Sequence, residues 1–176
     1  MHCSQLTELR GLNLFPSLKE LNVSSNSVLT MSGLESLRSL ETLNLSCNKL
    51  TRIFSLANIA RTLKHLNLSH NRIVSLLPMA EFAELSCLEV LDLTDNYVGE
   101  LSHISALAKH QRLRDLSFRR EGDESKGSNP ICDFVNYKDT VNLHLPQLQV
   151  LDGFRLNGYN PSPSSAPTGH RQFGKP

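Results

Sequence analysis

Apolar residues recur along this chain in a fixed pattern that places leucines at alternate positions and closes on an asparagine. The segments LKELNVSSN, LETLNLSCN, LKHLNLSHN and LEVLDLTDN begin at residues 18, 40, 63 and 88, at spacings of 22, 23 and 25. Alternating apolar residues share one face of an extended strand. Each segment therefore predicts a short strand followed by a turn, and successive strands should pair side by side.

This spacing and the pattern L-x-x-L-x-L-x-x-N are typical of leucine-rich repeats. We therefore expect the α/β class: a leucine-rich repeat solenoid, wound as a right-handed superhelix, with short parallel strands on the concave face and helical or irregular convex segments. A fifth segment keeps Leu113, Leu116 and Phe118 but has Glu121 at the asparagine position. The repeat is predicted to fail there.

The asparagine that closes each segment is expected to turn inward, because its amide can pair with backbone groups that the turn leaves free. An apolar residue two positions later returns the chain to the core. Stacking would align these side chains into a structural ladder, formed by Asn26, Asn48, Asn71 and Asn96.

Both ends of the stack depart from the repeat. At the front, Leu6 and Leu9 match the spacing of Leu50 and Ile53, so the chain opens in mid-repeat. Either a degenerate turn seals the stack, or an upstream repeat is missing from this version of the chain.

At the back, the charged loop RREGDESKGSNP precedes a predicted helix with Asp133 as N-cap and Pro146 as its end. The apolar face expected for this helix comprises Phe134, Val135, Tyr137, Val141 and Leu145. Leu148 and Leu151 predict a last partial strand. These features define a repeat domain over 1–156, with a C-terminal cap at about 129–156, and a proline-rich flexible tail or linker over 157–176.

Outward positions of the strands are the candidate binding residues. The first column comprises Glu20, Thr42, His65, Val90 and Asp115. The second comprises Asn22, Asn44, Asn67 and Asp92. Asparagine and serine are common filler in this architecture, so the more variable first column is the better candidate, with the apolar Val90 as a candidate contact centre.

A basic edge is expected at the C-terminal end, formed by Arg112, Arg114, Arg119 and Arg120. The acidic residues Glu121, Asp123 and Glu124 follow it directly. Two readings stay open, namely mutual neutralisation of these charges and docking of an acidic partner segment.

Composition narrows the choice of function. The net charge of +1 gives no bulk attraction to nucleic acid or membrane. The apolar runs are too short for a signal peptide or membrane span, which indicates a cytoplasmic protein. The four cysteines and seven histidines show no metal spacing, so we expect neither metal nor cofactor. Ser69, His70 and Asp95 could form a hydrolytic triad, but an open sheet excludes no water, so we predict no catalysis.

A closer likeness rests on the longer spacers before Leu88 and Leu113, the loop ending in NPIC, a Tyr137 helix and the string LPQLQVLDG. Over roughly residues 5–156, the chain resembles the N-terminal domain of the leucine-rich repeat and coiled-coil centrosomal protein family. The resemblance implies a module that binds a cytoskeletal or centriolar protein at the centrosome, centriole or basal body of a cilium or flagellum. We expect no small-molecule substrate and no membrane partner, and the net charge of +1 argues against a nucleic acid partner.

This chain contains no heptad pattern, so the family's coiled coil would lie outside it. Other intracellular repeat proteins share the cap pattern. The alternative is therefore a regulatory subunit of another complex, such as those of protein phosphatase 1, axonemal dynein or the spliceosome.

Overall fold

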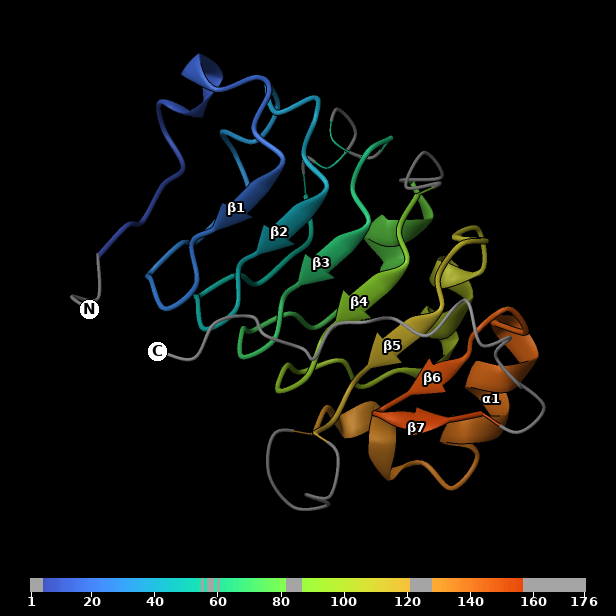
Figure 1. Ribbon diagram of the computed structural model, residues 1–176. Helices are drawn as coiled ribbons and strands as arrows, with labels where there is room; N and C mark the ends of the chain where they lie inside the picture. The colour runs from blue at the N-terminus through green and yellow to red at the C-terminus, as the bar shows by residue number, and fades with distance from the viewer. Residues whose placement is uncertain are drawn as a thin grey trace.

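The computed structural model describes residues 5–54, 56, 59, 61–81, 87–120 and 128–156. Within these residues, one seven-stranded sheet runs in chain order, and Figure 1 shows its strands side by side in a curved row. The strands are β1 (Glu20–Asn22), β2 (Thr42–Asn44), β3 (His65–Asn67), β4 (Val90–Asp92), β5 (Asp115–Ser117), β6 (Val150–Leu151) and β7 (Phe154–Arg155). The predicted repeat strands are therefore present.

The register of the sheet follows the leucine pattern. Strands β1 to β6 are parallel, and their central leucines align from Leu21 through Leu43, Leu66, Leu91 and Leu116 to Leu151. Strand β7 reverses direction and pairs antiparallel with β6. Because a shift of one residue would turn every leucine outward, burial of one face fixes this register.

The segments that return the chain between strands are short and mostly irregular. They include 3-10 helices at Leu12–Leu14, Leu77–Ala80, Leu101–Leu107 and Pro130–Asp133. The α-helix of the described residues, α1 (Tyr137–His144), lies beside β6 and β7 in Figure 1. These segments have the helical or irregular character expected of the convex side.

The core lies between the sheet and the return segments. Leucines of the internal repeats are fully buried, as are Leu40, Leu43 and Leu45 in the second repeat. Leu18, Leu21 and Val23 in the first repeat are only partly buried, because β1 is the edge strand of the sheet that the described residues form. Burial therefore depends on stacking, as expected of a solenoid.

The front of the chain continues the repeat pattern. The Leu6 N–H donates to Asn26 Oδ1 at 3.2 Å, in the way that the Leu50 N–H donates to Asn71 Oδ1 at 3.0 Å. Leu9 is buried, whereas Leu6 is largely exposed. Residues 6–9 therefore form the return half of a repeat, as their spacing predicts.

The predicted start of the C-terminal helix is wrong. Asp133 belongs to the preceding 3-10 helix, and Phe134 is extended, so α1 begins only at Tyr137. Asn136 holds the N-cap position without a side-chain hydrogen bond. Tyr137, Val141 and Leu145 are buried as expected, but Phe134 and Val135 lie exposed. The predicted tail at 157–176 lies outside the described residues.

Candidate functional site: the concave face and its supporting turns

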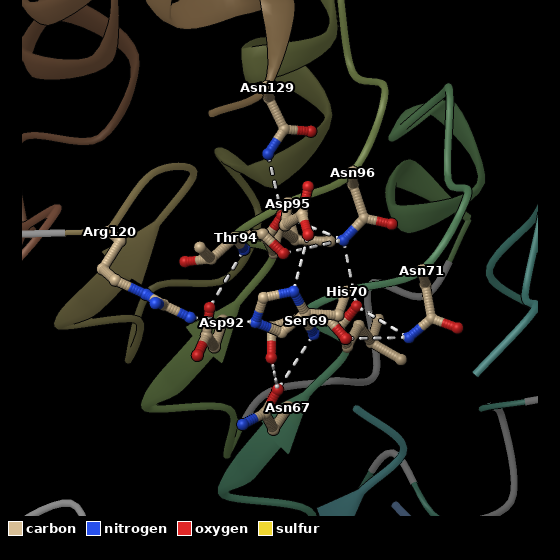
Figure 2. A network of polar contacts seen from close by, with 12 residues as sticks. Asn67, Ser69, His70, Asn71, Asp92, Thr94, Asp95, Asn96, Arg120 and Asn129 are labelled. Atoms are coloured by element: carbon tan, nitrogen blue, oxygen red, sulfur yellow. Dashed lines mark hydrogen bonds and ion pairs between the residues drawn. The ribbon is translucent and has the colours of Figure 1, made fainter. Parts of the chain in front are cut away.

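The asparagine ladder positions the strands of the concave face. Asn71 Nδ2 donates to the carbonyl oxygens of Leu45 and Leu68, at 3.0 and 2.9 Å, and its Oδ1 accepts from Leu50 N–H. Asn48 and Asn96 repeat the arrangement one turn earlier and one turn later. Figure 2 shows Asn71 and Asn96 with the same orientation. Each amide thus joins consecutive repeats, which is the predicted ladder.

The fifth repeat does not fail. Glu121, the residue in register, lies outside the described residues, but Asn129 takes the missing place. Its Oδ1 accepts from Val98 N–H at 2.9 Å, and its Nδ2 donates to Leu93 O and Phe118 O at 2.8 and 2.6 Å. Asn129 stands eight positions after Glu121 in the sequence, yet it makes the same kind of contacts as the other ladder asparagines.

Asp152 closes the last turn with a carboxylate instead of an amide. Its Oδ1 accepts from the backbone N–H groups of Phe118 and Arg119, at 2.8 and 3.2 Å. Its Oδ2 accepts from the Tyr137 hydroxyl at 3.1 Å and pairs with Arg119 Nε at 3.3 Å. A carboxylate only accepts hydrogen bonds, so this turn is built from four donors.

Burial around Asp152 changes the acidity of two neighbouring groups. Burial raises the pKa of the Cys132 thiol to about 12, and the negative charge of Asp152 adds to this. Burial likewise raises the pKa of Tyr137, again with a contribution from Asp152. Both groups therefore stay protonated at neutral pH and support the turn structurally.

A left-handed residue precedes each ladder asparagine. Ser25, Cys47, His70 and Asp95 have φ values between 54° and 58°, and Asp152 has the same conformation. Non-glycine residues adopt this conformation at a cost, which Asn, Asp and His tolerate best. Because residues 25, 47, 70 and 95 share this backbone conformation, the turn presents their side chains in the same direction in each repeat.

The first concave column is accessible along its length. Glu20 is exposed, and Thr42, His65, Val90 and Asp115 are half-buried on adjacent strands. Thr42 Oγ1 lies 3.5 Å from His65 Nδ1, so these two side chains contact each other across the sheet. The column presents hydroxyl, imidazole, aliphatic and carboxylate groups in a row.

The second column is less open than expected. Asn44 and Asn67 are buried, because their side chains fold back and their Oδ1 atoms accept from the backbone N–H of Ser46 and Ser69. Asn22 is exposed and Asp92 half-buried, although both make the same turn contact. Asn44 and Asn67 thus stiffen the strand ends and offer little contact area.

A charged rim, formed by Lys19, Glu41 and Lys64, precedes the strands. Glu41 lies 2.6 Å from Lys64 Nζ and 3.5 Å from Lys19 Nζ. The hydrogen bond and charge of Lys64 lower the pKa of Glu41, and Glu41 raises the pKa of Lys64 in return. This rim was not predicted from the sequence, although opposite charges at one repeat position are its signal.

Two of the four arginines expected at the basic edge make contacts within the protein. Arg119 is committed to Asp152, and Arg114 Nη1 donates to the carbonyls of Gln111 and Leu113. Arg112 Nη1 lies 3.9 Å from Cys87 Sγ. The acidic residues expected beside them, Glu121, Asp123 and Glu124, lie outside the described residues.

Arg120 instead joins a cluster with His70 and Asp95, visible in Figure 2. Arg120 Nη2 lies 3.3 Å from His70 Nε2, and His70 Nδ1 lies 2.6 Å from Asp95 Oδ2. A guanidinium can only donate, so Nε2 accepts and Nδ1–H donates to Asp95. The Ser69 hydroxyl donates to Asn67 Oδ1 at 2.7 Å, so these residues do not form a Ser-His-Asp relay.

Metal-binding and membrane-spanning features are both absent from the described part of the chain. No group of three or more His, Cys, Asp or Glu side chains there could hold a metal ion. No helix in the same residues is long and apolar enough to cross a membrane.

Comparison with protein families agrees with this geometry. The family described as "Leucine rich repeat" matches residues 38–98, and "Leucine Rich repeats (2 copies)" matches residues 16–58. Among known proteins, mouse (Mus musculus) dynein axonemal assembly factor 11 is 38% identical over 63 residues. That match covers 36% of this chain and 12% of the relative, so the chain corresponds to a small part of it.

Solved structures share the fold over most of this chain. An internalin, InlF, from Listeria monocytogenes superposes with a TM-score of 0.64 at 19% identity, covering 84% of this chain and 38% of its own. Internalin C2 of the same species superposes with a TM-score of 0.57 at 26% identity, covering 82% of this chain and 57% of its own. The SNF/U2A' complex of Drosophila melanogaster gives 0.53 at 20%, with coverages of 88% and 71%. The chain is a leucine-rich repeat solenoid, an architecture that serves as a protein-interaction module.

Proposed function

We propose that this chain is a non-catalytic module that binds a cytoskeletal partner protein in the cytoplasm, at a cilium or its basal body, across its concave face. The observation that carries the proposal is the accessible first column. Its central residues Thr42, His65 and Val90 lie on adjacent strands in fixed register. Such a row can contact an extended surface of another polypeptide.

The contacts of the neighbouring residues favour the centre of this column as the place where a partner binds. In the charged rim, the carboxylate of Glu41 already pairs with both Lys19 and Lys64, so these three side chains are engaged with one another. Asn44 and Asn67 are buried in turn contacts. Val90 is an apolar group on this face that a partner can cover without breaking any hydrogen bond, and covering apolar surface favours association.

The ciliary part of the proposal is supported by the likeness to an axonemal dynein assembly factor. A centrosomal or centriolar place is suggested by the sequence resemblance carried by NPIC and LPQLQVLDG. The alternative is a regulatory subunit of another intracellular complex, whether of protein phosphatase 1, axonemal dynein or the spliceosome. Among these, the relative's name favours the axonemal form, whereas the SNF/U2A' likeness is one of fold alone.

The test is the cellular location of the tagged chain in ciliated cells. His65→Glu and Val90→Glu place charge at the centre of the first column, where both side chains are only half-buried. Val74→Glu is the matched control, because Val74 is 54% exposed on a return segment. We expect the two concave variants to lose enrichment at the cilium or basal body and the control to keep it.

Two outcomes would contradict the proposal. Unchanged enrichment of both concave variants would reject the concave face as the binding surface. Nuclear enrichment of the wild-type chain would instead favour the spliceosomal alternative. Thermal unfolding of each purified variant confirms that any loss reflects binding and not folding.

A further inference from the structure

A groove of about 590 Å³ lies at the C-terminal end of the solenoid. Its walls come from α1 and the β6–β7 hairpin, which lie beside each other in Figure 1. None of its lining residues belongs to the two concave columns. It is therefore a surface separate from the one used in the proposed function.

The groove has an apolar floor and one exposed aromatic wall. Leu145, Leu148 and Leu151 line its floor and are themselves buried in the core. Phe154 lines its wall and remains 51% exposed. An exposed ring beside an apolar floor provides a site where a bulky apolar side chain can be buried.

The charge at the groove is positive by one. Lys138 and Arg155 line it together with a single carboxylate, Asp139. Lys138 Nζ lies 6.0 Å from the centroid of the Phe154 ring, a cation–π distance. Within the described residues, neither Lys138 nor Arg155 forms an ion pair, so both cations are free to meet a carboxylate of another molecule.

We propose that this groove binds an acidic segment of a partner protein. The segment inserts one bulky apolar side chain against Phe154 and places carboxylates beside Lys138 and Arg155. Asp139 opposes this charge and limits the affinity. Lys138 and Arg155 attract an acidic segment and Asp139 repels it, so substitutions at the two cations and at Asp139 should change the affinity in opposite directions.

The test uses the full chain and a fluorescein-labelled peptide of sequence Glu-Asp-Phe-Leu-Glu-Asp, with binding followed by fluorescence anisotropy at low salt. Two comparison peptides replace Phe-Leu by Ser-Ser, or every acidic residue by Lys. Amide shifts in ¹⁵N-labelled protein locate the bound peptide. We expect saturable binding of the first peptide alone, with the largest shifts at residues 137–156.

Charge variants then test the assignment of roles. Combined Lys138→Glu and Arg155→Glu should weaken binding about tenfold or more, and Asp139→Asn should tighten it about twofold to threefold. Arg52→Glu is the matched control, because Arg52 lies over Phe54 at 5.9 Å in a similar cation–π pair elsewhere. It should leave the affinity within about twofold.

Several results would overturn the proposal. These are absence of saturable binding, equal binding of the Ser-Ser or Lys peptide, shifts centred on the concave face, or tighter binding after charge reversal at Lys138 and Arg155. If another part of this chain occupied the groove, the labelled peptide would not bind there. The concave-face proposal is tested by the location of the His65 and Val90 variants in cells, so the two proposals can fail separately.

Discussion

Asn71 and Asp152 each stabilise a turn after a strand, by opposite hydrogen-bonding chemistry. The amide of Asn71 donates to carbonyl oxygens and accepts from one backbone N–H, whereas Asp152 only accepts, from two N–H groups, a phenol and a guanidinium. Each side chain matches the partners that its turn provides. The two residues should therefore not be interchangeable in type.

Exchange of the two chemistries gives the first prediction. Asn71→Asp and Asp152→Asn should each lower the free energy of unfolding by about 1–3 kcal/mol or more, because buried carbonyls or donors would lose their partners. Chemical denaturation measures the loss. Asn22→Asp is the control, because Asn22 is exposed and its Oδ1 accepts from the Ser24 N–H, a contact that Asp retains. Equal effects at all three sites would contradict the ladder's role.

Cysteine reactivity gives the second prediction. Burial raises the pKa of Cys132 to about 12, so its thiolate is scarce at pH 8, whereas Cys47 is exposed. Iodoacetamide should modify Cys47 in the folded protein and Cys132 only after unfolding. Mass spectrometry of time points distinguishes the sites. Modification of both at one rate in native conditions would contradict the packing around Asp152.

The charged rim gives the third prediction. Lys64 lowers the pKa of Glu41 from its usual 4.5, so their pairing stabilises the fold above that value and is lost as pH falls through the lowered pKa. Glu41→Gln should therefore reduce stability slightly at pH 7 and have no effect in stronger acid. Lys64→Met should likewise reduce stability at pH 7 and have no effect on it in stronger acid. A loss independent of pH would assign the effect to packing.

At the scale of elements, the repeat spacing predicts each strand because one face must be buried. Leu43, Leu66 and Leu91 are central residues of β2, β3 and β4, as the pattern requires. The ladder positions follow in the same way, because a turn of fixed length leaves the same backbone groups unpaired. Pattern and burial together determine the strands, their order and their register.

Other elements depend on contacts distant in sequence. Asn129 was not predicted as a ladder residue because it lies eight positions beyond the place that the repeat spacing gives, although Ile131 two positions later reproduces the spacing of Asn96 and Val98. Asp152 was not predicted as a turn residue, because the repeat pattern identifies its turns by asparagine. Folding back of Asn44 and Asn67 depends on the turn geometry, which a pattern of apolar positions does not encode.

Comparison of two leucines at the same repeat position gives the fourth prediction. Leu66→Ala should lower the free energy of unfolding by about 2–5 kcal/mol, because it leaves a cavity between repeats. Leu21→Ala should cost clearly less, because Leu21 on β1 is only partly buried. Denaturant unfolding compares them. Equal losses would contradict the open end of the sheet at β1.

At the scale of the whole molecule, stacking creates two surfaces that no single repeat contains. The first concave column needs consecutive strands in register to align Thr42, His65 and Val90. The C-terminal groove needs α1 against the β6–β7 hairpin. A module with two such surfaces could hold two partner segments at once, which suits an assembly or anchoring role.

Site-specific photocrosslinking in ciliated cells tests the central claim most directly, since it captures a partner of any identity. A benzophenone amino acid is introduced at position 65, 90 or 74 of the full chain, and captured proteins are identified by mass spectrometry. Concave-face binding predicts capture of one common protein from positions 65 and 90 and not from position 74. Capture of a partner protein from position 74, with none from positions 65 and 90, would contradict it.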